Sequence, residues 1–186
     1  MKVIAVGGEP ATGKTTMMKL LMSRIPGEWR ARKYGLLTVE KNDIAKVVIL
    51  GIYRGGSFEG TDRLPMNVQP DAERFLKLAD TILPGYKIVF EGDRLCNAKF
   101  FQAAENFGHD FCFWCLNAPE STLEARHSDR ADTQSGAFLK GRKTKYERLQ
   151  SAFKAETRPN TTGPELEAII VGILSSLGIQ AEPLPA

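Results

Sequence analysis

One eight-residue segment near the start of the chain constrains the fold more than any other feature. Residues 8–15 read GEPATGKT and match the pattern GxxxxGK[ST]. They follow the apolar run 3–6 and lead into a segment of helical character, 16–22. This order of strand, glycine-rich loop and helix separates a phosphate-binding loop from a chance match in a glycine-rich turn. The chain is therefore predicted to be an α/β protein that binds a nucleoside triphosphate.

The residue types in this loop suit the phosphates of a nucleotide. Its glycines allow backbone amides to converge on the phosphates, and the helix that follows presents the positive end of its dipole. Lys14 would reach the β- and γ-phosphates, and the Thr15 hydroxyl would bind Mg²⁺. The predicted nucleotide-binding residues of the loop are Gly8, Ala11, Thr12, Gly13, Lys14, Thr15 and Thr16.

Length and composition indicate a single globular domain. A chain of 186 residues is long enough for one α/β domain with a complete core and short for two. We expect this domain over residues 1–180 and a frayed tail over residues 181–186. No apolar run approaches the roughly 18 residues that cross a bilayer, and we identify no signal segment. These features predict a soluble, cytoplasmic protein without a membrane partner.

Apolar runs bounded by turn residues alternate with segments of helical periodicity. This pattern is typical of a parallel sheet covered by helices on both faces. The predicted strands are 2–7, 35–39, 46–53, 86–91 and 110–116. The predicted helices are 14–24, 70–82, 97–107, 119–130, 137–154 and 164–177. The expected fold is the three-layer α/β/α arrangement of P-loop NTPases, with a central parallel sheet.

Charged residues follow the strand predicted at 86–91. Ligands gather at the carboxyl ends of strands in open α/β sheets, and Glu91 and Asp93 share a face in extended backbone. Such a pair beside the loop would hold Mg²⁺, directly or through water, and one carboxylate would take the proton of an acceptor hydroxyl. Arg94 would neutralise charge on the transferred group. The alternative is a strand-end turn with solvated charges.

The segment 54–70 is long and rich in glycine and proline, which is typical of a functional loop. We predict that it lies on the substrate side of the site. Asp62 is a second candidate for the base, and Arg63 is a candidate for gripping an acceptor phosphate through both guanidinium nitrogens. The alternative is a turn-forming aspartate next to a surface arginine.

Basic residues concentrate between residues 126 and 158. Arg126 and Arg130 are four residues apart on a predicted helix and therefore project from one side of it. Together with Arg142 they suit a lid over 126–148 that closes on the triphosphate and stabilises the charge of phosphoryl transfer. Residues 132–136 would form the tip of this lid. The alternative is a solvated helix face.

In these features the chain resembles the P-loop nucleoside and nucleotide kinases. The matching parts are the loop 8–15, the strand end 91–94, the arginines of the lid and the segment 159–162 before the last helix. The resemblance implies ATP as the donor and Mg²⁺ as the metal. It also implies that Asn160, with Pro159 and Thr161, lies beside the adenine.

Two further segments narrow the resemblance. GTDRLPM at 60–66 and FLKGRKTK at 138–145 look like phage-encoded kinases associated with thymidine hypermodification. This resemblance implies transfer to the hydroxymethyl group of 5-hydroxymethyluracil in DNA, in the cytoplasm of a phage host. The Asp-Arg-Tyr arrangement of thymidylate kinases is absent, because leucine follows each candidate Asp-Arg pair. The implied acceptor-side residues are Asp62, Arg63, Glu91 and Arg142.

Three other functions remain open at this stage. A kinase of free nucleoside monophosphates needs a closed acceptor pocket, whereas a DNA kinase needs an open basic groove. A P-loop switch or ATPase subunit would act through conformational change. A catalytically silent nucleotide-binding partner is disfavoured by the intact set of Lys14, Thr15, Glu91 and Asp93.

Overall fold

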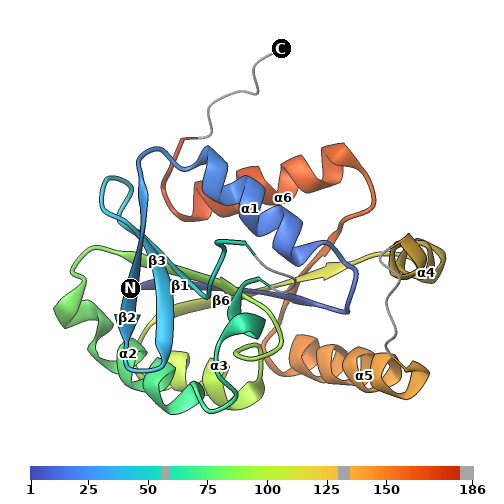
Figure 1. Ribbon diagram of the computed structural model, residues 1–186, viewed down its shortest axis with the longest axis horizontal. Coiled ribbons are helices and arrows are strands. Elements are labelled where there is room, and N and C mark those ends of the chain that lie inside the picture. Colours follow the sequence, from blue (N-terminus) through green and yellow to red (C-terminus); the bar gives the residue numbers. More distant parts are fainter. Residues whose placement is uncertain (56–58, 130–134, 181–186) are drawn as a thin grey trace.

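The structure, a computed structural model, describes residues 1–55, 59–129 and 135–180. Within these residues a seven-stranded sheet lies between two layers of helices (Figure 1). The strands are β1 (Lys2–Gly8), β2 (Trp29–Tyr34), β3 (Leu37–Asn42), β4 (Val47–Leu50), β5 (Lys87–Glu91), β6 (Asp110–Asn117) and β7 (Glu156–Pro159). The helices are α1 (Lys14–Arg24), α2 (Gln69–Ile82), α3 (Ala98–Asn106), α4 (Glu120–Asp129), α5 (Gly136–Ala152) and α6 (Gly163–Ser176).

The order of the strands across the sheet is β2-β3-β4-β5-β1-β6-β7. Strand β3 runs antiparallel to both of its neighbours, and the other adjacent pairs are parallel. The segments that follow β1, β5 and β6 therefore all leave the same edge of the sheet. Val6 pairs with Glu91 in register. This pairing brings the glycine-rich loop and the acidic end of β5 side by side.

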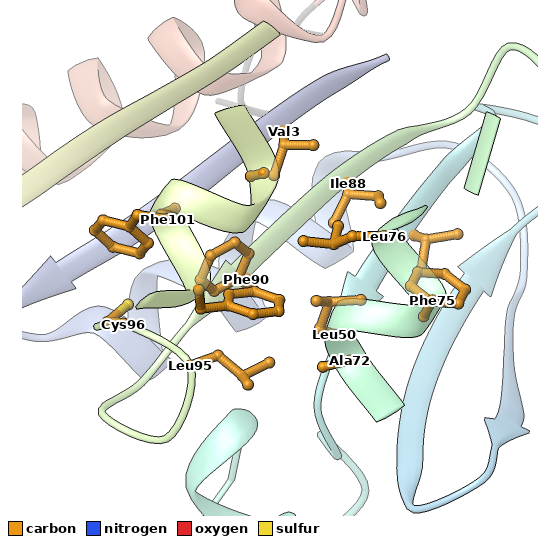
Figure 2. Packing of buried hydrophobic residues seen from close by; sticks show 14 of the residues in the cluster. Val3, Leu50, Ala72, Phe75, Leu76, Ile88, Phe90, Leu95, Cys96 and Phe101 are labelled. Carbon is orange, nitrogen blue, oxygen red and sulfur yellow. The ribbon is translucent and has the colours of Figure 1, made fainter. Parts of the chain in front are cut away.

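Each face of the sheet has its own core. Helices α1 and α6 cover one face, and helices α2, α3 and α5 cover the other (Figure 1). Burying one large apolar side chain contributes about 1.5–3 kcal/mol, so the two cores hold the strand ends firmly beneath the site. Figure 2 shows part of the second core, with Leu50, Phe75, Leu76, Ile88, Phe90 and Phe101 among its members.

The predicted three-layer fold is confirmed, and each predicted helix agrees with the structure to within two residues at either end. The strand predicted at 46–53 ends at Leu50, and the one predicted at 35–39 lies at 37–42. Strands β2 and β7 are not predicted by the sequence. Both are edge strands with mostly exposed side chains, so they lack the apolar alternation that reveals a half-buried strand.

The segment predicted as a long loop has partial structure. Ile52 and Gly60 form an isolated bridge, a short 3₁₀ helix spans Thr61–Arg63, and α2 begins at Gln69. Most of the predicted lid tip, like residues 181–186 of the predicted tail, lies outside the described residues. Among the helices of the described ranges, none is long and apolar enough to span a membrane.

Candidate active site

The glycine-rich loop packs against the loop that precedes α6. Gly13, at the start of α1, has a φ of 86°, and a Cβ at this position would lie 2.6 Å from Nδ2 of Asn160. Only glycine suits both the left-handed backbone and the close contact. The same Nδ2 donates a hydrogen bond of 2.7 Å to the carbonyl oxygen of Thr12. The buried Asn160 side chain thus joins the predicted phosphate and base sides of the site.

Lys14 lies at the centre of the site. Its Nζ donates hydrogen bonds of 2.8 Å to the carbonyl oxygens of Gly8 and Glu9. Burial raises the pKa of Asp62 and of Glu91, and the positive charge of Lys14 offsets part of this effect. The same charge helps to hold the pKa of Asp93 below its usual range. The ammonium group and these carboxylates therefore surround one space at the carboxyl edge of the sheet.

Glu91 is the buried acid of the site. Its Oε1 lies 3.3 Å from the hydroxyls of Thr15 and Tyr53, both of which donate to it. A Cβ at Gly60 would collide with this carboxylate. Burial, partly offset by Lys14, raises the pKa of Glu91 to about 7. The Glu91 carboxyl group thus lies beside the Thr15 hydroxyl, and its burial disfavours the negative charge unless a cation is present.

This pair of oxygens fits Mg²⁺. The metal typically binds one or two carboxylates together with phosphates and waters. No cluster of three histidine, cysteine, aspartate or glutamate side chains suited to a metal occurs among the described residues. Thr15 and Glu91 would accordingly contribute ligands on one side, and the nucleotide phosphates would contribute them on the other.

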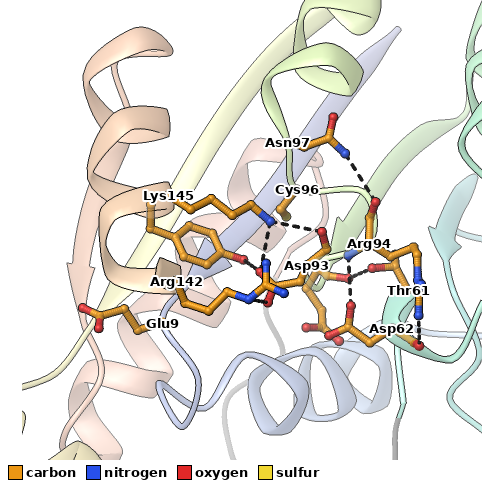
Figure 3. A network of polar contacts seen from close by, with 12 residues as sticks. Glu9, Thr61, Asp62, Asp93, Arg94, Cys96, Asn97, Arg142 and Lys145 are labelled. Atoms are coloured by element: carbon orange, nitrogen blue, oxygen red, sulfur yellow. Dashed lines mark hydrogen bonds and ion pairs between the residues drawn. The ribbon is translucent and has the colours of Figure 1, made fainter. Parts of the chain in front are cut away.

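A set of short contacts fixes the turn that carries Asp62, and Figure 3 shows Asp62 beside Thr61 and Arg94. The buried Thr61 hydroxyl donates to the backbone oxygen of Glu91 at 2.7 Å. The backbone amide of Arg94 donates to Oδ1 of Asp62 at 3.0 Å. The Asp62 side chain remains open to solvent on one side, yet partial burial raises its pKa. These features suit a carboxylate that accepts a proton.

Arg94 braces the turn that carries Asp62. Its Nη2 donates to the carbonyl oxygen of Asp62 at 3.0 Å, and its Nη1 contacts the sulfur of Met66. The sequence predicts that Arg94 neutralises charge on the transferred group. In the structure the guanidinium group contacts Asp62 and Met66.

Asp93 is bound by three groups from α5 (Figure 3). The Tyr146 hydroxyl donates to Oδ1 at 2.6 Å, and Lys145 and Arg142 form ion pairs of 3.2 and 3.0 Å. Burial alone would raise the pKa of Asp93, but these three partners outweigh burial and hold it below its usual range. Asp93 and Glu91 thus have separate surroundings, although both lie near Lys14.

A cavity of about 320 Å³ opens beside the start of α1. Arg126 reaches into its wall from α4 and donates to the carbonyl oxygens of Ala11 and Asn160 at 3.1 and 3.0 Å. The lining residues are Gly13, Thr16, Arg126, Asn160, Thr161, Thr162, Gly163 and Leu166. The structure therefore brings Arg126 to the side of the site predicted for the adenine, away from Asp62.

The sequence also predicts site roles for Arg130 and Arg63. Arg130 lies outside the described residues. The guanidinium group of Arg63 is exposed and donates to the carbonyl oxygens of Arg54 and Gly55. Arg63 therefore closes the start of its own loop in this conformation.

Thr15 and Arg142 are predicted site residues, but the other polar partners of Glu91 and Asp93 are not predicted from the sequence. Thr61 lies inside the motif at 60–66, where roles are predicted only for the charged residues Asp62 and Arg63. Lys145 and Tyr146 follow Arg142 by three and four residues, which places them on one face of α5, and this spacing was the available signal. Tyr53 has no sequence signal, because only the fold brings it to Glu91.

The family of the chain follows from its sequence as a whole. The model of the family described as P-loop Nucleotide Kinase3 matches residues 1–171. The chain belongs to this family. It is therefore a P-loop kinase and a phosphotransferase, with the loop at 8–15 and the acids at 62, 91 and 93 inside the matched range.

Solved structures share the fold of this kinase at low identity. The tunicamycin resistance protein of Deinococcus radiodurans has a TM-score of 0.57 at 16% identity, over 98% of both chains. A sugar kinase of Janibacter sp. HTCC2649 has a TM-score of 0.56 at 14% identity, over 96% of this chain and 95% of its own. A gluconokinase of Sinorhizobium meliloti 1021 has a TM-score of 0.53 at 14% identity, over 95% and 91%. No curated protein matches the kinase.

Replacing Glu91 by glutamine should stabilise the metal-free kinase at alkaline pH. The raised pKa means that ionising Glu91 opposes folding, so this group lowers the free energy of unfolding as pH rises from about 4.5 to about 7. At pH 8 we expect Glu91→Gln to unfold at a higher urea concentration than the wild type, with a free energy of unfolding larger by about 2–4 kcal/mol. At pH 5 the two proteins should have nearly equal free energies of unfolding. Equal stability of the two proteins at pH 8 would contradict a buried, destabilising charge.

Proposed function

We propose that this kinase uses ATP and Mg²⁺ to phosphorylate a hydroxyl group on a pyrimidine, the 5-hydroxymethyl group of 5-hydroxymethyluracil in DNA. The observation that carries the proposal is the position of Asp62. It is held beside the Thr15–Glu91 pair and yet is open to solvent on one side. A carboxylate in this position accepts a hydroxyl proton from a substrate that approaches from outside.

The donor side supports ATP. The cavity beside Gly13 would hold the adenosine moiety, with Asn160 at its floor and Arg126 at its wall. Lys14 would turn from the carbonyl oxygens of its own loop to the β- and γ-phosphates, and Thr15 with Glu91 would hold the metal. Bound Mg²⁺ would neutralise negative charge on the phosphates.

On the acceptor side, Asp62 would orient the hydroxyl and accept its proton as the oxygen attacks the γ-phosphorus. Proton removal by a positioned carboxylate contributes typically about 10²- to 10⁴-fold to the rate. Arg142, beside Asp93 and with its side chain partly exposed, would stabilise charge on the transferring phosphoryl group. Asp93 would position Arg142 and Lys145 for this task.

DNA is supported as the acceptor because the residues around Asp62 are exposed to solvent and the nearby helix α5 is positively charged. Residues 62, 63 and 65–67 are exposed, whereas a kinase of free nucleotides would enclose its acceptor. Helix α5 adds exposed positive side chains at Lys140, Lys143 and Arg148. Positive charge along an open surface favours a polyanionic substrate.

The test is transfer of label from γ-labelled ATP to a panel of acceptors. The panel contains DNA with 5-hydroxymethyluracil, the same DNA with thymine, free pyrimidine nucleotides and gluconate. We expect label only on the DNA with the hydroxymethyl group. Label on free monophosphates alone would identify a nucleotide kinase and overturn the DNA proposal. Rapid hydrolysis without any acceptor would favour an ATPase or switch.

A further inference from the structure

We infer that Met66 and Phe138 form a clamp for a pyrimidine turned out of a DNA duplex, with Met66 entering the vacated stack and Phe138 stacking on the extruded base. This inference rests on the proposed function and deepens it. It identifies the form in which the acceptor reaches the acids, as a base outside the helix.

Met66 is an exposed apolar protrusion. Its side chain is 84% exposed, whereas Leu64 and Val68 on either side of it are buried in the core. The amide of Val68 also donates to the carbonyl oxygen of Pro65 at 3.1 Å, which closes the turn beneath Met66. The backbone on both sides of Met66 is therefore anchored, and methionine is one of the apolar side chains that DNA-bending proteins insert between base steps.

Met66 is linked to the candidate base, Asp62, through Arg94. Its sulfur contacts the guanidinium group of Arg94, and Arg94 in turn holds both the backbone and the carboxylate of Asp62. The protrusion and the candidate base therefore belong to one braced turn. A duplex that receives the wedge would present the neighbouring nucleotide to Asp62.

Phe138 provides the opposite contact. It lies in the first turn of α5, is 38% exposed, and stacks on the guanidinium group of Arg142 at 4.6 Å from the ring centre. Arg142 pairs with Asp93 at 3.0 Å. Figure 3 shows Arg142 and Asp62 on opposite sides of Asp93. Aromatic rings stacked with arginine are common platforms for unstacked bases.

Physical chemistry favours both contacts for the same substrate. Turning a base out of a duplex costs a few kcal/mol in lost stacking and pairing. An apolar side chain that fills the gap recovers part of this cost, and a ring that stacks on the extruded base recovers another part. The first contribution exists only in a duplex, whereas the second exists in single strands as well.

The two contributions can therefore be separated by comparing a duplex substrate with a single strand. The substrates are one 5-hydroxymethyluracil oligonucleotide as a single strand and as a duplex, assayed for kcat/KM with γ-labelled ATP. We expect Met66→Ala to lower kcat/KM on the duplex by about tenfold or more, and on the single strand by less than about twofold. Ile44→Ala is the matched control, because Ile44 is also strongly exposed, at 73%, but lies in the turn at the opposite edge of the sheet.

Phe138→Ala should lower kcat/KM on both substrates, mainly through KM. Phe107→Ala is its control, since Phe107 has nearly the same exposure, 37%, at the far end of α3. Equal losses on both substrates for Met66→Ala, or none, would overturn the wedge while leaving DNA phosphorylation in place. Wild-type kinase that labels neither substrate would overturn the proposed function and this inference together.

Discussion

Lys14→Ala should abolish phosphoryl transfer and leave the fold intact. The Lys14 ammonium group acts on all three acids of the site, and its hydrogen-bond partners are carbonyl oxygens of its own loop. Removing a preorganised positive group from a phosphoryl-transfer site costs at least about 100-fold in rate. Labelled transfer measures the loss, and circular dichroism with thermal unfolding measures the fold.

Lys19→Ala provides the control for this substitution. Lys19 belongs to the same helix, is largely exposed and pairs with Glu59 at 2.8 Å. The Lys19 side chain is 55% exposed and that of Glu59 is 11% exposed, so the variant should lose some stability, because the Glu59 charge is left without this partner, but it should retain turnover. Loss of soluble protein for Lys14→Ala, with Lys19→Ala still soluble, would show that the contacts of Lys14 with Gly8 and Glu9 are structural.

Asp62→Asn should reduce kcat by about 10²- to 10⁴-fold with little change in nucleotide affinity. The amide still accepts the hydrogen bond from the Arg94 backbone, but it cannot take a proton. The wild-type rate should also rise with pH as Asp62 ionises, and the raised pKa places this acidic limb above the usual aspartate range. Single-turnover rates across pH, with nucleotide binding measured separately, test both expectations.

Asp93→Asn is the informative comparison, because it removes an acid of the same site with different partners. Its negative charge holds Arg142, Lys145 and the Tyr146 hydroxyl. Hydrogen bonds to a charged group contribute about 1.5–3 kcal/mol each, so this variant should lose stability as well as rate. An Asp93→Asn variant with full stability and no turnover, beside an active Asp62→Asn, would reverse the assignment of the base.

Most of the fold can be read from the sequence because its determinants are local. Helices α2 and α3 have the periodicity of one buried face, and the central strands are continuous apolar runs between turns. Strands β2 and β7 are not predicted from the sequence, because each forms only by hydrogen bonding to the single strand beside it in the sheet. The sequence WRARKY is a strand only because β3 supplies hydrogen-bond partners from Leu37 to Asn42.

The candidate site divides in the same way. The loop and its residues follow from one contiguous motif, and the adjacency of Glu91 to the loop follows from the rule for parallel sheets. The roles of Asp62 and Asp93 stay open in the sequence, because they depend on partners 32 and 53 residues away, Arg94 and Tyr146. Likewise, a helix pattern shows that Arg126 is outward-facing but not that it meets Ala11 and Asn160.

Tyr146 gives the kinase a fixed pivot. Its ring is 1% exposed and lies so close to β1 that a Cβ at Gly7 would approach within 2.6 Å, while its hydroxyl holds Asp93. Helix α5 is thus anchored at Tyr146, and also at Arg142 and Lys145 through Asp93. Gly141, where an added Cβ would meet no atom within 4 Å, lies between these anchors and Phe138. Bending at Gly141 would swing Phe138 toward or away from the acceptor while the strand beneath the triphosphate stays still. The enzyme would then admit DNA without a change in the residues that bind ATP.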